Sequence, residues 1–174
     1  MWTPNTTADS AAKQFLTASA WQLRDYNFPK IREAVERLTA AELWLRPGSA
    51  SNSVGNLLLH LNGNVRQHIL GGVGGGSQTR ERDAEFGAVG GPSGAELLLA
   101  LEATVRAAHD VLVTCDPSML LERREIQGKD VVLLDDIYHV VEHFSYHTGQ
   151  IIYIVKALRN EGFDWYRALE KGTP

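Results

Sequence analysis

Apolar residues recur every three or four positions over four long stretches of the chain, a spacing that places them on one face of an α-helix. The four predicted helices span about residues 10–38, 54–70, 94–115 and 132–159. Each has a polar opposite face, so each helix must bury one side against the others. Four amphipathic helices in 174 residues predict an all-α fold, a four-helix bundle forming one domain over residues 1–174.

Residues with strong preferences for helix ends support these boundaries. Ser53 and Ser93 precede the second and third helices as N-caps, and Gly71 is expected to end the second. Residues 39–42 (TAAE) have the pattern of a capping box, which predicts an additional short helical turn. Pro29 lies inside the first predicted helix and should kink or bend it.

The connections between the helices differ in length. The link between the first two helices is short and allows them to pack antiparallel. A glycine-rich segment, residues 71–91, follows the second helix and is long enough to cross over the end of the bundle, so parallel neighbours become possible. A connection of this length can also form a lip over a site, and its charged stretch predicts a salt-bridged loop at Arg80, Arg82, Asp83 and Glu85.

Shorter stretches complete the chain. Residues 120–132 contain short alternating runs around a Gly-Lys-Asp turn, which suggests a small hairpin or an irregular link. Residues 1–9 are expected to form a loose arm, and the aromatic residues of the tail after Gly162 are expected to pack back onto the body.

The composition excludes several classes of protein. Lys and Arg number 17 against 21 Asp and Glu, a net charge of −4 without a basic block, so no nucleic-acid partner is expected. No apolar run reaches the roughly 20 residues of a membrane span, and the N-terminus does not resemble a signal peptide. Cys115 is the only cysteine, which excludes an internal disulfide and fits a cytoplasmic protein. Its apolar neighbours favour a structural role over a nucleophilic one.

The fourth predicted helix carries a stripe of polar side chains among apolar neighbours. His139, His143 and His147 lie four residues apart, and Asp136 and Gln150 fall within about 40° of His143 around the helix axis. Several polar groups on a buried face need partners, and a divalent metal can serve several imidazoles at once. One HxxxH pair is common by chance, however, so a single hydrogen-bonded core histidine is the alternative.

The second predicted helix supplies a fourth histidine. His60 lies among leucines in the middle of that helix, with Asn56, Asn64 and Gln67 on the same side. His68, near the expected helix end, and His109, beside an aspartate, are predicted to face solvent. In a helical bundle, His60 and histidines of the fourth helix can meet across the core at one depth.

Three imidazoles and open coordination positions are typical of a catalytic metal, whereas a structural zinc site uses four protein ligands. Such a set suits zinc, nickel, copper or iron(II). Asp136, Gln150 and Asn64 are candidates to accept hydrogen bonds from the ligands' second ring nitrogens. The residues alone leave open whether His139 is a fourth ligand or a supporting residue.

Two other metal and nucleotide motifs are not matched. Glu142 does not follow the first histidine as the glutamate of a zinc protease does. The run GGVGGG at residues 71–76 follows a predicted helix and lacks the Gly-Lys-Ser/Thr of a phosphate-binding loop.

The segments NSVGNLLLHLNGNVRQHI and HVVEHFSYHTGQI resemble the DinB/YfiT-like superfamily of bacterial four-helix-bundle proteins, and the resemblance spans nearly the whole chain. It implies an up-down-down-up bundle with a long Gly-rich crossover after the second helix, and frequent homodimers. It also implies a divalent-metal site at His60, His143 and His147, with His139 outside the ligand set. Characterised relatives include bacillithiol-dependent S-transferases and the mycothiol-dependent maleylpyruvate isomerase.

These observations together predict a DinB-like metalloenzyme that activates a small thiol, as an S-transferase does, and acts on a small-molecule substrate. Zinc is the first choice of metal, with nickel or iron(II) as alternatives, and a low-molecular-weight thiol is the expected second cofactor. A metal-dependent hydrolase needs the same ligands and remains an alternative. The other alternative is a non-catalytic stress-response or binding module that the metal only stabilises. No catalytic residue apart from the ligands is assigned.

Overall fold

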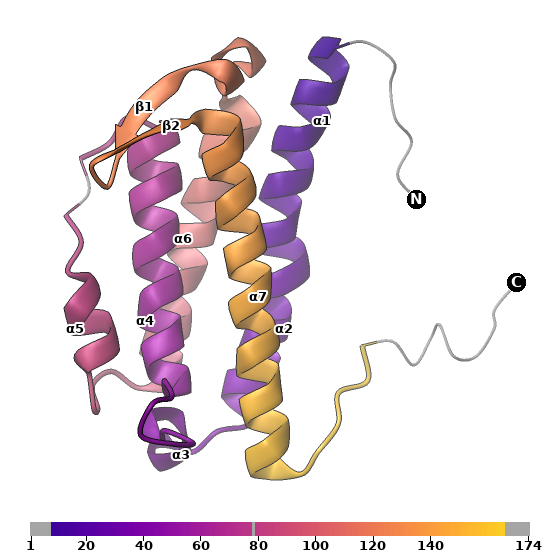
Figure 1. The fold of residues 1–174 in the computed structure, drawn as a ribbon. Helices are drawn as coiled ribbons and strands as arrows, with labels where there is room; N and C mark the ends of the chain where they lie inside the picture. Colours follow the sequence, from indigo (N-terminus) through magenta and orange to yellow (C-terminus); the bar gives the residue numbers. More distant parts are fainter. Residues whose placement is uncertain (1–7, 78, 166–174) are drawn as a thin grey trace, which may run out of the picture.

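Four long helical segments lie side by side in the computed structural model, which describes residues 8–77 and 79–165 (Figure 1). The helical elements are α1 (Ala8–Trp21), η1 (Gln22–Asn27), α2 (Phe28–Glu36), α3 (Ala40–Trp44), α4 (Val54–Val65), η2 (Arg66–Val73), α5 (Arg82–Gly87), α6 (Gly94–Thr114), η3 (Pro117–Leu121) and α7 (Leu133–Arg159). Two short strands, β1 (Arg123–Ile126) and β2 (Lys129–Val132), complete them. Residues 1–7 of the expected N-terminal arm lie outside the described residues, and α1 begins at Ala8. In the tail, Phe163 packs against the core and stacks on Trp165, which confirms the expected return of these two aromatic residues onto the body; Tyr166 lies outside the described residues.

The long segments run in two directions. In Figure 1 the first segment (α1, η1 and α2) and α7 run from top to bottom, whereas α4 and α6 run from bottom to top. The helix α4 packs against α6, its parallel neighbour, and against α7, its antiparallel neighbour. The first segment packs against α6 and α7. The expectation of an all-α fold is thus confirmed apart from the two-stranded sheet.

One core joins all four segments. Its fully buried side chains include Leu23 and Ile31 from the first segment, Leu61 from α4, Leu101 from α6 and Phe144 from α7. These residues occupy the apolar positions of the helical pattern, so hydrophobic burial follows the predicted faces. None of the described helices is long and apolar enough to cross a membrane.

Pro29 is accommodated by a π-helical segment. The turn η1, Gln22–Asn27, precedes α2 directly, and the chain passes from α1 through η1 into α2 without a break in the helix. Proline cannot donate a backbone hydrogen bond and crowds the preceding turn, which a wider π turn relieves. The Asn27 side chain donates to the Gln22 carbonyl oxygen at 2.8 Å and to Ser145 Oγ at 3.0 Å, which ties this turn to α7.

The predicted N-terminal caps are confirmed. Thr39, Ser53 and Ser93 each accept a hydrogen bond from the backbone N–H three residues later, and each forms a reciprocal capping box. The prediction for the end of the second helix is wrong, because the chain continues past Gly71 as the π-helix η2 and ends at Val73.

The crossover contains a short helix that the sequence pattern did not predict. Helix α5 lies beside α4 and is fixed there by side chains that satisfy its C-terminal carbonyl groups. Asn56 Nδ2 donates to the Glu85 and Ala88 carbonyl oxygens at 2.9 and 2.8 Å, and Arg46 donates to that of Phe86. The crossover is therefore attached along α4, and it returns the chain to the end of the helical segments where α6 begins.

The predicted hairpin is present and covers the end of η2. Strands β1 and β2 pair antiparallel, from Arg123 opposite Val132 to Ile126 opposite Lys129. The turn lies at Gln127 and Gly128, whose φ angles of 54° and 69° suit a two-residue hairpin loop, so it begins before the expected Gly-Lys-Asp position.

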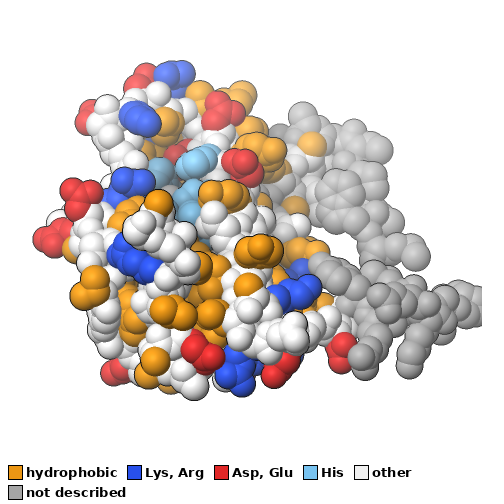
Figure 2. Space-filling view, turned by 60° about the horizontal axis from the view of Figure 1, so that its bottom comes forward, with side chains coloured by type: hydrophobic (Ala, Val, Ile, Leu, Met, Phe, Trp, Pro, Cys, Tyr) orange, Lys and Arg blue, Asp and Glu red, His pale blue; other side chains and the backbone are white. Residues whose placement is uncertain are grey.

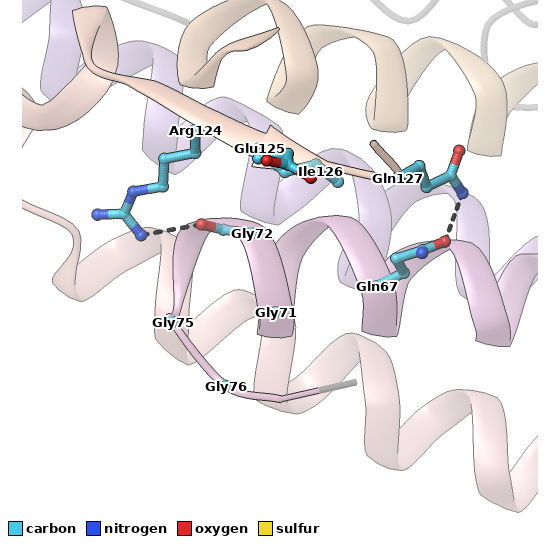
Figure 3. Close-up of a pocket in the computed structure, with 9 residues that line it drawn as sticks. All are labelled: Gln67, Gly71, Gly72, Gly75, Gly76, Arg124, Glu125, Ile126 and Gln127. Carbon is cyan, nitrogen blue, oxygen red and sulfur yellow. Dashed lines mark hydrogen bonds between the residues drawn. The ribbon is translucent and has the colours of Figure 1, made fainter. Parts of the chain in front are cut away.

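A pocket of about 290 Å³ separates this hairpin from η2 (Figure 3). The glycine-rich stretch after Leu70 forms one wall, and Arg124 donates to the Gly72 and Val73 carbonyl oxygens at 2.9 and 3.2 Å. Gln127 donates to Gln67 across the opening. Arg124, Gln127 and Gln67 thus link the hairpin to η2 by hydrogen bonds.

Candidate metal centre

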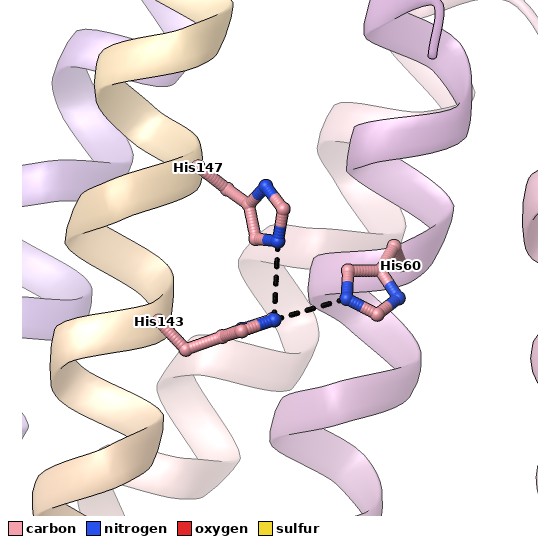
Figure 4. Close-up of side chains that lie close together, drawn as sticks. All are labelled: His60, His143 and His147. Carbon is pink, nitrogen blue, oxygen red and sulfur yellow. Dashed lines mark hydrogen bonds between the residues drawn. The ribbon is translucent and has the colours of Figure 1, made fainter. Parts of the chain in front are cut away.

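Three of the histidines predicted from the sequence meet between α4 and α7. His60 on α4 and His143 and His147 on α7 direct their Nε2 atoms toward one another (Figure 4). The Nε2 atom of His143 lies 3.0 Å from that of His60 and 3.1 Å from that of His147. One potential ligand atom from each residue lies within 4.8 Å of the other two.

The helices place these side chains by simple geometry. His143 and His147 are one turn apart on α7, so both face α4. His60 lies on the buried face of α4, where its exposure is 4%. Because α4 and α7 run antiparallel and in contact, His60 reaches the level of the α7 pair from the opposite side.

The separations fit a shared metal ion. Metal–imidazole bonds of about 2.0–2.1 Å place two ligand nitrogens about 3.0 Å apart at right-angled bonds and about 3.4 Å apart at tetrahedral bonds. The two measured Nε2 separations lie at the lower end of this range. The described residues bring no fourth His, Cys, Asp or Glu into the group.

Hydrogen bonds at the far side of the rings determine where the lone pairs point. His147 Nδ1 lies 2.7 Å from Gln150 Oε1, while the amide nitrogen of Gln150 donates to the Tyr146 hydroxyl at 2.9 Å. The amide oxygen therefore faces His147, and Nδ1 of that ring carries the proton. His60 Nδ1 lies 3.0 Å from Glu85 Oε2, and we assign its proton to a hydrogen bond with this carboxylate. Both residues therefore present an unprotonated Nε2 to the centre, as metal ligation requires.

His143 completes a set of three converging nitrogens that needs a cation. The Nε2 atom of His143 faces the lone pairs of His60 Nε2 and His147 Nε2. An N–H group on His143 could form a good hydrogen bond with only one of these two lone pairs. The Nδ1 atom of His143 is buried and has no hydrogen-bond partner among the described residues. The donor set therefore fits a divalent ion better than it fits mutual hydrogen bonding.

Glu85 and Arg80 form the support behind His60. Arg80 Nε donates to Glu85 Oε1 at 2.7 Å and Nη2 donates to Oε2 at 2.8 Å, and both side chains are about nine-tenths buried. Arg80 Nη2 also lies 2.9 Å from His60 Nδ1. Because a guanidinium has no lone pair and already donates to the carboxylate, we assign the Nδ1 proton to a hydrogen bond with Glu85.

The charge of Glu85 agrees with this assignment. Burial by itself would raise the pKa of the Glu85 carboxyl, but hydrogen bonds from Arg80 and His60 hold it below its ordinary value. The carboxylate is thus ionised at neutral pH and accepts from both partners. The ring of Phe86, the next residue, lies 4.4 Å from that of His60 between centroids. The sequence indicated a salt-bridged loop here but not its contact with a ligand.

The imidazoles are in the form that binds metal. Burial, together with the neighbouring His147, His60, His139 and Arg80, lowers the pKa of His143 to about 3. Burial also lowers the pKa of His147 to about 4, although the hydrogen bond with Gln150 opposes this shift. Both rings are therefore neutral at pH 7 and keep lone pairs available for a metal.

The remaining histidines lie outside the group. His139 is exposed, and its ring centroid is 5.6 Å from that of His143. The prediction that His68 is exposed is wrong: it is 7% exposed, and its Nδ1 lies 2.8 Å from Asp136 Oδ1. His109 is half-buried beside Asp110, with 3.1 Å between Nδ1 and Oδ1.

Of the residues predicted to support the ligands by hydrogen bonds, only Gln150 contacts a histidine of the group. Asp136 does not, because its carboxylate faces His68. Asn64 is buried, but its Oδ1 has no hydrogen-bond partner among the described residues. Figure 2 shows histidine side chains at the floor of a hollow, so small molecules can reach this face of the molecule.

A family model described as "Protein of unknown function (DUF1572)" matches residues 10–171 of this chain. No curated protein and no solved structure was found to match it.

We expect His60→Ala, His143→Ala and His147→Ala each to abolish stoichiometric metal binding, because two imidazoles hold a divalent ion much more weakly than three. His68→Ala and His109→Ala should bind one ion per chain, since neither side chain belongs to the group. Metal analysis after equilibrium dialysis, with circular dichroism to verify folding, measures the difference. Full occupancy in any of the first three variants would remove that residue from the ligand set.

Glu85→Gln should lower metal affinity about 10- to 100-fold, as the loss of a ligand's supporting partner commonly does. The variant leaves Arg80 without its carboxylate and weakens the orientation of His60. Asp83→Asn is the matched control, because it removes the same charge from an exposed position of α5. Competition with a chromophoric chelator measures both affinities. Equal affinities for the two variants would show that Glu85 does not support the site.

Proposed function

The chain belongs to the DUF1572 family, whose function is unknown, and we propose that it is a DinB-like four-helix-bundle metalloenzyme that activates a small thiol for transfer to an electrophile. The observation that carries this proposal is the convergence of three Nε2 atoms from His60, His143 and His147. The order and directions of the long helical segments agree with an up-down-down-up bundle. Zinc is the proposed metal, with nickel or iron(II) as alternatives.

An open metal site is the basis for proposing catalysis. Three ligands leave at least one coordination position, and the described residues supply no fourth ligand to fill it. His143 is only partly buried, so protein atoms do not fully enclose the centre. A closed structural site would instead surround the ion with protein atoms.

The side chains around the site have separate tasks. A bound divalent ion lowers the pKa of a thiol, so that the thiolate becomes available as a nucleophile near neutral pH. Glu85 and Gln150 hold two ligand rings in the required tautomer, each by one hydrogen bond. Phe86 packs its ring against that of His60. The proton of the thiol leaves to solvent through the hollow.

Two alternatives use the same residues. A metal-dependent hydrolase would activate water in place of a thiol, and nothing in the ligand set distinguishes the two. A non-catalytic, metal-stabilised stress-response or binding module is the second alternative, because an ion shared by α4 and α7 would cross-link two long helices. We further propose a cytoplasmic homodimer, in line with the resemblance to DinB-like proteins.

Metal-loaded protein should accelerate the conjugation of a small thiol to an electrophile such as monochlorobimane. Protein loaded with zinc, nickel or iron(II) would be assayed with bacillithiol, mycothiol and glutathione. The rate should fall to background after chelation and in His143→Ala, and should persist in His109→Ala. Hydrolysis of an activated ester without thiol would favour the hydrolase instead. Background rates with every metal and thiol would count against the transferase.

Acidification should release the metal before it unfolds the protein. Protons compete with the ion for imidazole only where the free ring would be protonated, and the pKa values of His143 and His147 are lowered to about 3 and about 4, so metal loss is expected only below about pH 4. The fully buried apolar side chains of all four segments remain packed. Parallel measurement of metal release and circular dichroism tests this. Coincident unfolding and metal release would identify a structural ion.

A further inference from the structure

We propose that the electrophilic substrate is uncharged and partly aromatic, and that it binds in a groove of about 590 Å³ at the lower end of the α4–α7 contact in Figure 1. This inference rests on the proposed function, because it identifies the substrate class of the same site. The groove is formed by α7, by the first turn of α4 and by the loop that precedes α4.

The groove lies one helical turn from the three histidines. Leu57 precedes His60 by three residues on α4, and Gln150 follows His147 by three residues on α7. Because the two helices are antiparallel, these steps lead in the same direction from the centre. Gln150 both lines the groove and contacts His147. A ligand in the groove therefore has one end beside the metal centre.

The lining indicates an uncharged occupant. None of the described residues that line the groove carries a formal charge at neutral pH. An ionic group bound here would lose hydration without gaining a counter-charge, which is costly. The polar groups present are neutral, such as the Asn52 amide of the loop and the Gln150 amide, and their N–H groups can donate to nitro or carbonyl oxygens.

The residues that line the groove also indicate that part of the substrate is aromatic. Tyr146 and Tyr153 are 58% and 75% exposed, so their rings are accessible, and they lie on either side of Gly149 along α7. A Cβ atom placed on Gly149 would have no neighbour within 4 Å, so the space between the rings is open. Two accessible rings separated by open space provide stacking surfaces for a flat substrate.

An aryl chloride illustrates the reaction that this placement allows. The thiol sulfur forms a bond with the ring carbon, the carbon–chlorine bond breaks, and chloride leaves with the bonding electron pair. The thiol proton passes to solvent, so that thiol and aryl chloride give thioether, chloride and a proton. No oxidant or reductant is needed.

Binding to the metal-free protein tests the groove separately from catalysis. The probes are 2,4-dinitrotoluene, which is uncharged and has no leaving group, and 2,4-dinitrobenzoate, its anionic counterpart. Saturation-transfer NMR and equilibrium dialysis should show the uncharged probe binding at least about tenfold more tightly. Equal binding, or tighter binding of the benzoate, would overturn the proposal.

Substitutions within α7 then locate the bound probe. Gly149→Leu fills the open space and should weaken binding about tenfold or more, and Tyr153→Ala should weaken it about three- to tenfold through loss of a stacking ring. Tyr138→Ala is the matched control, because Tyr138 is 63% exposed on the same helix but does not line the groove. Its affinity should equal that of the unchanged protein.

Gly149 also lines a hollow on another side of α7 that contains Lys30 and Lys156. A probe bound there would be insensitive to Tyr153→Ala and would favour the anion, and either result would overturn the proposal. Circular dichroism and metal stoichiometry confirm that each variant is folded.

The conjugation assay separates the two proposals. With 1-chloro-2,4-dinitrobenzene, Gly149→Leu should raise KM about tenfold or more with unchanged metal content, and 4-chloro-3-nitrobenzoate should be a poor substrate. Selective probe binding without conjugation would refute the transferase and keep the groove as a binding site. Conjugation that is indifferent to substrate charge and to Gly149→Leu would refute the groove.

Discussion

The antiparallel contact between α4 and α7 is the constraint on which the candidate site depends. It brings His60 to the level of His143 and His147, although the first and last of these are 87 positions apart in the chain. Neither helix alone can offer three imidazoles to one point. The packing of apolar faces therefore brings three buried lone pairs together, and the fit to a divalent ion follows from their mutual repulsion when no cation lies between them.

The parallel neighbours α4 and α6 impose the second feature of the site. Because α6 begins at the same end of the helical segments as α4, the chain must return along α4, and this crossover places Glu85 and Arg80 against His60. The charged pair Arg80 and Glu85 thus supports one side of the centre. The uncharged groove, which Leu57 and Gln150 line, adjoins the centre on another side. The centre lies between an ionic support and an apolar approach, an arrangement suited to a neutral substrate.

The sequence by itself determined the features that depend on local periodicity. The 3.6-residue spacing predicted the four long helical segments, and the caps at Ser53 and Ser93 predicted the starts of two of them. The cap at Thr39 predicted the short helix α3, and the α7 stripe predicted the face that carries His143 and His147. The same periodicity predicted the contact of Gln150 with His147, because the two residues are three positions apart on one helix. Local patterns suffice here because each of these contacts lies within one or two turns of a single helix.

Tertiary structure decided what periodicity cannot reach. An angular position on a helix says nothing about the level at which two helices meet, so Asp136 was expected near the three histidines but instead faces His68. The π-helical turns of η1 and η2 had no signal in an α-helical pattern, and η2 carried the helix beyond Gly71 and buried His68. Glu85 meets His60 across 25 positions of the chain through a loop whose path is set by α4 and α6, and only the packed helices fix that path.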